Sequence, residues 1–371
     1  MIDIGDGVAV ESQDREQWGP QLQRHMAEKV QDSRARAQTA AALRALRDRL
    51  AGCPPSSKLS MSVLLRARAK LKAGKAPGPD HVTVTMIKNI TWASLRRVLV
   101  GFQMMYERRI PCPEGWREIS ATLMPKEAHI EDLKDTRVLC MQSVVMKWYM
   151  SCIVTMIEER IEHSHHYVQL YGFRPDRKIS EITSVLKRVS QHAAVWGKAD
   201  SLFLANLDIL QAFDHVSPLL ALRCMEELQI PQDLIHALLD PLADNRCVAN
   251  FEGVQTPDPV MWDKSIRTGG VGGPLIFLMV SIVLWRNVVE EWRAKETVGY
   301  QLESGTLFGK DRITHTLWAD NLLLYAHTRE DLSDMIRDMS IPLLEAGLTW
   351  KPKSFQYMYF GAPPGIPPTP A

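Results

Sequence analysis

The segment HTLWADNLLLYA, residues 315–326, constrains the fold of this chain more than any other feature. Two apolar runs meet at a three-residue polar turn that presents Asp320 and Asn321, a pattern typical of a β-hairpin. Asp and Asn tolerate the left-handed backbone that a tight turn requires. Such turns are common, so this hairpin alone indicates structure rather than chemistry.

A second acidic residue ends a second apolar segment. SLFLANLD, residues 201–208, is short and apolar, which favours a buried strand ending at Asp208, and Asp214 follows six residues later. A carboxylate among apolar backbone segments is costly unless a positive charge neutralises it. Two strands that each deliver an acid can hold a pair of Mg²⁺ ions, with Mn²⁺ as the alternative ion, and such a pair promotes nucleotidyl transfer. The sequence therefore predicts a metal site at Asp208 and Asp320.

Helical periodicity dominates the rest of the chain, which predicts a mixed α+β fold with more helices than strands. Residues 142–162 predict an amphipathic helix, and a helix over 330–346 must be kinked or split by Pro342 and end at Gly347. Further helices are expected at residues 179–196, 218–228, 232–242 and 275–294, and a strand at 246–254.

Charge is unevenly distributed along the sequence. The formal net charge is only +1, yet residues 61–126 carry 12 Lys and Arg against 4 Asp and Glu. Such a block suggests a surface that meets a polyanion, although any single lysine is more often a solubilising side chain.

Composition places the chain among ordinary globular proteins, with 46% apolar and 23% charged residues. The longest uncharged apolar run, PLIFLMVSIVLW, is shorter than the roughly 18 residues of a membrane span, so we expect a soluble intracellular protein without membrane segments.

The six cysteines show no metal-ligand spacing. HSHH, residues 163–166, could bind a metal, but a solvated surface is the commoner interpretation.

Six motifs, in their order along the chain, resemble those of the reverse transcriptase domain of LINE-type, non-LTR retrotransposons. The resemblance runs from about residue 61 to residue 360 and rests on KAPGPD (75–80), LMPK (123–126), YGFRPDR (171–177), NLDILQAFDHV (206–216), SIRTGGVGGP (265–274) and LWADNLLLYA (317–326). It implies the fingers and palm of a right-hand polymerase, with an antiparallel palm sheet backed by helices. It also implies an RNA-directed DNA polymerase that extends a DNA primer on an RNA template with deoxynucleoside triphosphates, using two metal ions.

The resemblance assigns catalytic roles around the acid pair. Asp208 matches the first catalytic aspartate and Asp320 the first acid of the family's YADD box, here WADN, so both would be metal ligands. Asn321 replaces the second acid of that box, which removes a charge and should weaken ion binding. In AGLTWKPKSFQYMYF, which resembles the family's GL..N..K segment, strict register puts Ser354 on the lysine position. Either the neighbouring Lys353 donates the proton to pyrophosphate, or that role is missing.

The resemblance also assigns residues that would contact the substrates. Lys126 of LMPK and Arg137 of DTRVL match two cations that grip the triphosphate, although each could be an exposed surface charge. Phe213 matches an aromatic gate that would exclude a 2′-hydroxyl, although core packing would also explain it. Arg174 and Arg177 of YGFRPDR would lie near the template or stabilise the fingers.

The glycine-rich motif SIRTGGVGGP aligns with the family's GVRQGDPLSP, and its residues would position the nucleotide. Arg267 and Gly269 match the family's residues, whereas Thr268 stands where the family has a longer glutamine that contacts the nucleotide. The glycines permit close backbone approach to a base pair, although a flexible loop before a helix would show the same pattern.

The expected domain organisation follows the same resemblance. Residues 1–60 form an N-terminal helical extension and linker, 61–200 mainly fingers with a basic surface, and 201–360 mainly palm, with part of 218–270 assignable to the fingers. Residues 361–371 form a Pro-rich tail that we expect to be disordered.

The sequence after residue 360 is too short for a helical thumb, and no endonuclease domain or zinc knuckle is recognisable. We therefore expect a part of a longer polyprotein that acts in the nucleus. Two alternatives stay open: a decayed or repurposed copy that binds nucleic acid without polymerising, and a nucleotidyltransferase that needs no template.

Overall fold

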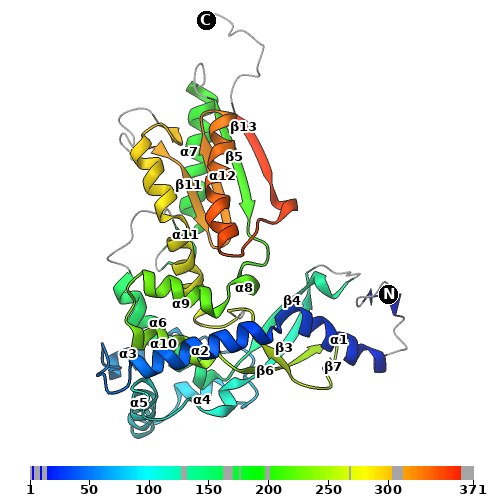
Figure 1. Ribbon diagram of the computed structural model, residues 1–371, viewed down its shortest axis with the longest axis vertical. Coiled ribbons are helices and arrows are strands. Elements are labelled where there is room, and N and C mark those ends of the chain that lie inside the picture. Colours follow the sequence, from blue (N-terminus) through cyan, green and yellow to red (C-terminus); the bar gives the residue numbers. More distant parts are fainter. Residues whose placement is uncertain are drawn as a thin grey trace, which may run out of the picture. The chain divides into compact units, whose positions relative to one another are not determined.

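The computed structural model describes residues 2–3, 9–10, 15–126, 132–161, 170–174, 177–196, 201–266, 269–302 and 312–360. The chain forms two compact units, of which unit 1 comprises residues 1–163 and 213–276 and unit 2 comprises residues 164–212 and 277–371. Helices α8 (Ala212–His215) and α11 (Gly273–Lys295) carry the chain from one unit to the other. Both units combine helices with a largely antiparallel sheet, which confirms the α+β class (Figure 1).

A five-stranded sheet forms one side of unit 1. Strand β3 pairs antiparallel with β4 and parallel with β6, and β6 pairs with both β7 and β8. The strands are β3 (Glu118–Pro125), β4 (Thr136–Met141), β6 (Asn245–Phe251), β7 (Val254–Gln255) and β8 (Val260–Trp262). Helix α1 (Arg15–Val30) covers one face, where its residues Leu22 and Met26 are buried in one cluster with Ile119 and Phe251. The N-terminal helix is therefore part of the core of unit 1.

Helices form the other side of unit 1. They are α2 (Ser33–Arg49), α3 (Met61–Lys70), α4 (Val84–Lys88), α5 (Trp92–Tyr106), α6 (Val144–Ile161), α9 (Pro218–Glu227) and α10 (Gln232–Leu239). Side-chain caps fix several of their starts: Asp32, Thr91 and Ser217 each accept a backbone N–H of the following first turn. Short elements complete the unit: β1 (Ile2–Asp3), β2 (Ala9–Val10), η1 (Glu114–Arg117), η2 (Leu133–Asp135) and η3 (Asp240–Leu242).

Helix α6 corrects one sequence-based expectation. The apolar spacing over residues 142–162 predicted an amphipathic helix, but 13 of the 18 residues of α6 are buried. The reason is that α3 and α10 both pack against α6, so that it has little surface left for solvent.

Unit 2 is built on a four-stranded antiparallel sheet in the order β11–β12–β5–β13. Its strands are β5 (Leu202–Asp208), β11 (His315–Trp318), β12 (Asn321–Ala326) and β13 (Gln356–Phe360). Helix α12 (Arg329–Glu345) lies in front of this sheet and α7 (Ile179–Trp196) behind it (Figure 1). The small ribbon of β9 (Tyr300–Gln301) and β10 (Arg312–Ile313) and the turn η4 (Pro352–Ser354) complete the described part of unit 2.

Helix α12 begins and ends as its sequence predicts, but Pro342 does not split it. The side chain of Thr328 caps its start, and Gly347, with φ 76°, follows its end. One helix runs through Pro342, which removes a single backbone donor. The indole of Trp285 on α11 donates to the carbonyl of Met339, so the turn around the proline is held against a neighbouring helix.

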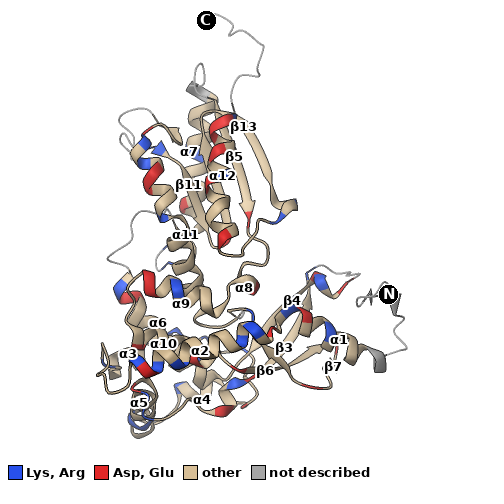
Figure 2. Ribbon diagram, viewed as in Figure 1, with Lys and Arg blue, Asp and Glu red and all other residues tan. Residues whose placement is uncertain are grey.

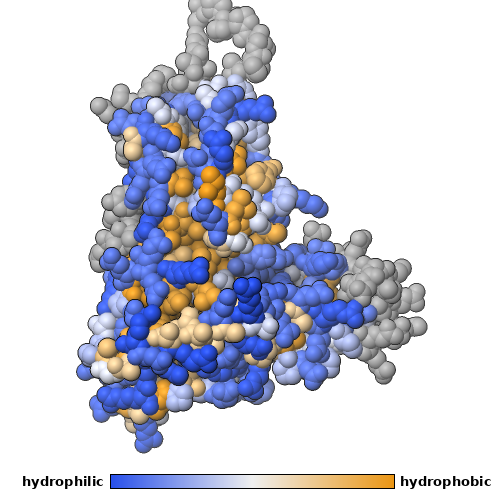
Figure 3. Space-filling model, in the orientation of Figure 1, coloured by the Kyte–Doolittle hydropathy of each residue, from blue (hydrophilic) through white to orange (hydrophobic). Residues whose placement is uncertain are grey.

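Helix α11 is long and apolar enough to cross a membrane by length and composition. However, 61% of its most apolar window is buried inside the protein, which is typical of a core helix. Hydrophilic residues cover much of the visible face of unit 1, interrupted by a pale orange band of more apolar residues (Figure 3). The HSHH segment at 163–166 and the tail at 361–371 lie outside the described residues.

Candidate active site

The hairpin of β11 and β12 presents Asp320 at its tip. Trp318 pairs with Asn321, so the turn has two residues, Ala319 and Asp320, rather than the three expected. The left-handed conformation falls on Ala319, with φ 55°, and not on Asp320 or Asn321. Two-residue hairpin turns need a positive φ at their first central position, which is Ala319 here. Asn321 is therefore the first residue of β12, and its side chain is exposed.

Strand β5 brings Asp208 alongside this tip. In the antiparallel pairing of β5 with β12, Asp208 lies opposite Asn321, and the N–H of Ile209 donates to the carbonyl of Asp320 at 3.1 Å. Side chains of paired residues share one face of a sheet, so Asp208 and Asn321 project to the same side. Two acids 112 positions apart in the sequence thus meet at one end of one sheet, as the sequence predicted.

The electrostatics of the acid pair reflect this proximity. Partial burial raises the pKa of Asp320, and the neighbouring Asp208 raises it further through charge repulsion and a hydrogen bond between the two carboxyl groups. Its own backbone N–H and the ammonium of Lys351 lower this pKa, but they do not cancel the rise. The pair is thus short of positive charge, the condition in which a bound cation is most favourable.

Lys351 is the residue of this site that the sequence analysis missed. Its Nζ lies 3.5 Å from Oδ2 of Asp208, and its backbone N–H donates to the carbonyl of Asp208 at 2.8 Å. Ile209 forms a bridge with Trp350, so the segment before η4 extends the pairing at the end of β5. The segment TWKPK contains two lysines around a proline, and no periodicity in the sequence distinguishes which one faces the acids.

Ser354 and Lys353 occupy different environments in the same turn. The hydroxyl of Ser354 accepts the N–H of Asp208 at 3.0 Å and donates to the carbonyl of Lys351 at 2.7 Å. Ser354 therefore fastens η4 to β5, whereas the side chain of Lys353 is exposed in that turn. The proton-donor role of Lys353 stays a prediction.

The first residues of the YGFRPDR segment, Tyr171 and Gly172, pack against the acid-bearing hairpin. The N–H of Tyr171 donates to the carbonyl of Leu317 at 2.9 Å, and a Cβ atom added at Gly172 would overlap the backbone nitrogen of Ala319. Only glycine allows this approach, so the segment supports the hairpin tip. Arg177 pairs with Glu181 at 2.8 Å and lies 5.6 Å over the ring of Tyr171, and Arg174 is half-buried. A template contact of either arginine stays a prediction.

Lys126 and Arg137 lie in unit 1, at the end of the β3–β4 pair where the chain passes from one strand to the other. Met124 pairs with Arg137, and Lys126 follows Met124 by two residues, so both cations lie on the same face of the hairpin. Arg137 is exposed, and the ammonium of Lys126 donates to the carbonyl of Lys134 at 2.9 Å. Two adjacent cations on an exposed face could grip a polyphosphate.

The other sequence-predicted substrate residues also belong to unit 1. Phe213 is half-buried in α8, and the next residue, Asp214, forms an ion pair with Lys29 at 3.0 Å, which supports a structural role for that acid. Gly269, with φ 92°, lies against the carbonyl of Cys140 on β4, so its close approach is to a neighbouring strand. Arg267 and Thr268 lie outside the described residues.

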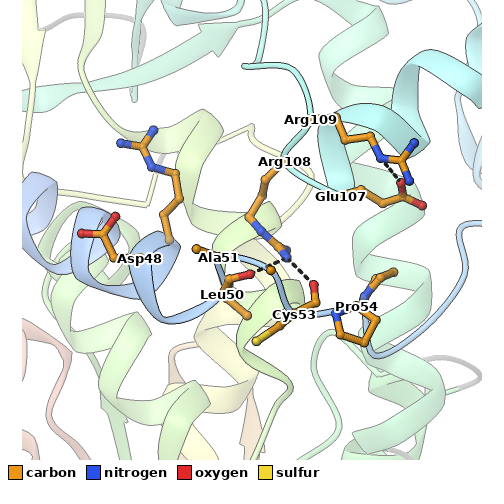
Figure 4. A pocket seen from close by; sticks show the side chains of 11 residues that line it. Asp48, Leu50, Ala51, Cys53, Pro54, Glu107, Arg108 and Arg109 are labelled. Carbon is orange, nitrogen blue, oxygen red and sulfur yellow. Dashed lines mark hydrogen bonds and ion pairs between the residues drawn. The ribbon is translucent and has the colours of Figure 1, made fainter.

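A cavity of about 690 Å³ lies elsewhere in unit 1, at the end of α2 (Figure 4). Its central side chain, Arg108, donates to the carbonyls of Leu50 and Cys53 at 3.2 and 3.3 Å. Arg109 pairs with Glu107 at 2.8 Å. Arg108 therefore satisfies carbonyls left open after the helix, which is a structural task.

The donor set of the acid pair fits a hard divalent ion. Asp208 and Asp320 supply carboxylate oxygens, and Asn321, opposite Asp208, can supply an amide carbonyl. In the part of the chain that the structure describes, no group of three or more His, Cys, Asp or Glu residues is arranged for a metal. Mg²⁺ suits this situation because it commonly binds one or two carboxylates and completes its shell with water and substrate phosphates.

The sequence is similar to a known protein family and to proteins of retrotransposable elements. A model of the family "reverse transcriptase (RNA-dependent DNA polymerase)" matches residues 124–363. The chain is 25% identical over 279 residues to a retrovirus-related Pol polyprotein from the type-1 retrotransposable element R2 of Nasonia vitripennis, a match that covers 75% of this chain and 25% of that protein. It is 21% identical over 272 residues to a Pol polyprotein from the type-2 retrotransposable element R2DM of Drosophila melanogaster, covering 73% and 24%.

These matches confirm the resemblance to retrotransposon reverse transcriptases, and the chain spans about a quarter of the length of the relatives it matches. The family match takes in Asp208 and the hairpin that carries Asp320. The chain belongs to the reverse transcriptase (RNA-dependent DNA polymerase) family.

Proposed function

We propose that the chain catalyses RNA-directed DNA synthesis as part of a non-LTR retroelement polyprotein. The single observation that carries the proposal is the convergence of Asp208 and Asp320 at the end of one antiparallel sheet. In the right-hand architecture, unit 2 would hold the catalytic sheet of the palm, and most of unit 1 would form the fingers. The substrates would be an RNA template, a DNA primer and deoxynucleoside triphosphates.

In the proposed reaction, the 3′-hydroxyl of the primer attacks the α-phosphorus of the nucleotide, a new phosphodiester bond forms, and pyrophosphate leaves. Asp208 and Asp320 would hold two Mg²⁺ ions, and such a pair would supply activation of the attacking hydroxyl and neutralisation of charge on the leaving oxygen. Lys126 and Arg137 would bind the triphosphate, and the Phe213 ring would exclude a 2′-hydroxyl. Lys353 would protonate the leaving pyrophosphate.

A primer-extension assay with Mg²⁺ and a primed RNA template tests the proposal. We expect Asp208→Asn and Asp320→Asn each to lower incorporation by roughly a thousandfold or more, because each removes a metal ligand needed in the transition state. Asp334→Asn is the matched control, since Asp334 is an exposed acid of α12 that pairs only with its helix neighbour Arg337 in the described structure.

Three outcomes would redirect the proposal. Incorporation that survives both active-site changes would refute the role of the acid pair. Absence of incorporation by folded protein, also after a thumb segment is supplied, would indicate a relic that binds nucleic acid. Equal extension with and without template would indicate a template-independent nucleotidyltransferase.

The nuclear location stays a prediction that imaging of the tagged protein tests.

A further inference from the structure

Helices α4 and α5 of unit 1 lie within a stretch without acidic residues. Residues 81–106, between Asp80 and Glu107, contain no Asp or Glu but include Lys88, Arg96 and Arg97. Within the basic block of residues 61–126, these two helices therefore carry positive charge without any acidic residue. Figure 2 marks basic residues in the region of α5. An anionic partner would therefore not be repelled by any negatively charged side chain of this stretch.

The outward side of these helices combines exposed apolar and basic side chains. Trp92 is 52% exposed and Val100 57% exposed, and Arg96 lies midway between them at helical spacing of four. Arg97, one position further, is exposed as well. The opposite side of α5 carries Leu95, Phe102 and Tyr106, which are buried. α5 is therefore anchored by one face and presents a tryptophan and two arginines on the other.

The basic residues of this face differ from their neighbours in their pairing. On α3, Arg66 pairs with Glu159 at 2.6 Å and Lys70 with Glu158 at 2.7 Å. By contrast, no acidic side chain within the described ranges pairs with Lys88, Arg96 or Arg97. Their charge is therefore available to a partner, whereas that of α3 is largely cancelled.

We propose that this surface, formed by Lys88, Trp92, Arg96, Arg97 and Val100 and here termed the α4–α5 surface, binds single-stranded nucleic acid. Trp92 would stack on a base, the cations would contact phosphates, and Val100 would extend the apolar contact. From Trp92 to Val100 the helix rises about 12 Å, which is long enough to contact more than one nucleotide of a strand. None of these residues belongs to the proposed polymerase site, so this function is additional to catalysis.

The chemistry of the surface favours nucleic acid over a protein partner. The exposed indole of Trp92, on a helix that also carries the exposed Arg96 and Arg97, can stack with every base, because each base has a π-face. A surface with several positive charges and no acidic residue is complementary to the regularly spaced negative charges of a phosphate backbone. A protein-binding face of comparable size normally has a polar rim of mixed charge around its apolar centre.

The test uses an eight-nucleotide oligo(U) and an eight-nucleotide oligo(dT), each labelled with fluorescein, and measures anisotropy without nucleotide substrates or Mg²⁺. We expect Trp92→Ala to weaken binding by roughly tenfold to a hundredfold and Trp92→Phe to weaken it less, because phenylalanine retains a stacking face. Changing both Arg96 and Arg97 to Gln should reduce the slope of log K against log salt by about 1.4, since each lost contact to a single strand contributes about 0.7.

Controls separate this surface from the polymerase site and from general charge effects. Arg337→Gln removes an arginine from α12 and should leave affinity unchanged. Primer extension is measured on the Trp92 and arginine variants as well, so a failure of catalysis and a failure of this proposal are distinguishable. Unaltered affinity and salt dependence in the Trp92 and arginine variants would overturn the proposal.

Photo-cross-linking locates the contact directly. A 5-bromouridine oligonucleotide should cross-link to the tryptic peptide of residues 89–96, which contains Trp92 and follows the cleavage site at Lys88. Cross-links confined to other peptides would overturn the proposal even if the variants bind less tightly. Self-association through the same face, lost in Trp92→Ala while oligonucleotide binding persists, would instead assign the surface to a second copy of the chain.

Discussion

At the scale of single residues, the site depends on one cation and one glycine to which the sequence analysis assigned no role. Lys351 lies beside Asp208, and Gly172 lies against Ala319 at the hairpin tip. The two acids could be located from the sequence because each ends an apolar run. The position of Lys351 and the left-handed conformation of Ala319 could not be predicted. Both depend on tertiary contacts that a loop and a two-residue turn make with strands distant in sequence.

Lys351 should compete with divalent ions for the acid pair. Its ammonium is half exposed and lies 3.5 Å from Asp208, so replacing it with methionine removes a cation that a metal ion must displace. We expect Lys351→Met to tighten Mn²⁺ binding by about twofold to fivefold, the scale of an exposed ion pair. Titration of Mn²⁺ monitored by electron paramagnetic resonance measures this affinity. Lys353→Met is the matched control and should have a smaller effect, and a weaker affinity in Lys351→Met would contradict the expectation.

Gly172→Ala should displace the hairpin tip. Its new methyl group would overlap the backbone of Ala319, so Asp320 must shift. We expect a loss of roughly 1–3 kcal/mol in the free energy of unfolding and a fall in primer extension of about a hundredfold. Urea unfolding and primer extension measure the two effects. In Gly115→Ala, where no atom lies within 4 Å of the added Cβ, both should stay near wild type.

At the scale of elements, apolar runs predicted where strands and helices occur, whereas the neighbouring elements determine how many faces of each one are buried. Residues 201–208 form β5, and residues 246–254 form β6 and β7 separated by a turn at Glu252 and Gly253, both with positive φ. The amphipathic spacing of α6 gave no sign that several helices would enclose it. Periodicity reports which residues are apolar, whereas tertiary packing decides how many faces are covered.

Strand β11 should make unit 2 sensitive to acid. Burial, with a smaller contribution from Arg293, lowers the pKa of His315 to about 3, and its Nδ1 lies 2.8 Å from the hydroxyl of Thr314. Because the folded pKa is below the ordinary value of 6.5, the folded state favours neutral imidazole. Stability is therefore complete above pH 6.5 and is lost as pH falls towards 3, by up to about 1.4 kcal/mol per pH unit.

Urea unfolding at pH 7.5, 5.5 and 4.5 measures this dependence. We expect His315→Asn to be less stable at pH 7.5 but to lose less stability on acidification than the wild type. His81→Asn, which changes an exposed histidine, should keep the wild-type pH dependence. An identical pH slope in His315→Asn and wild type would exclude His315 as the source.

At the scale of the whole molecule, the chain divides into a unit that carries the acid pair and a unit that carries the basic block. Residues 1–60 belong entirely to unit 1, and α1 covers its sheet. The order of motifs along the sequence indicates the family but not this division, because each unit is assembled from two separate chain segments.

Unit 1 should therefore depend on its N-terminal helix. Met26 is fully buried against the sheet, so Met26→Ala should lower the free energy of unfolding by about 2–5 kcal/mol. Glu28→Ala, on the exposed side of α1, should change it by less than about 0.5 kcal/mol. Chemical denaturation followed by circular dichroism measures both. Equal stability of the two variants would mean that α1 contributes little to the unit.

Strand β13 has a consequence for the behaviour of the protein at high concentration. It forms one border of the sheet in unit 2, and its residues Tyr357 and Met358 are 53% and 38% exposed. An edge strand has unpaired backbone N–H and C=O groups that can bind another strand. Exposed apolar side chains stabilise such a pair and slow its dissociation. Oligomers should therefore accumulate through edge-to-edge pairing, and a charged residue introduced at position 358 would act as a gatekeeper that keeps neighbouring molecules apart.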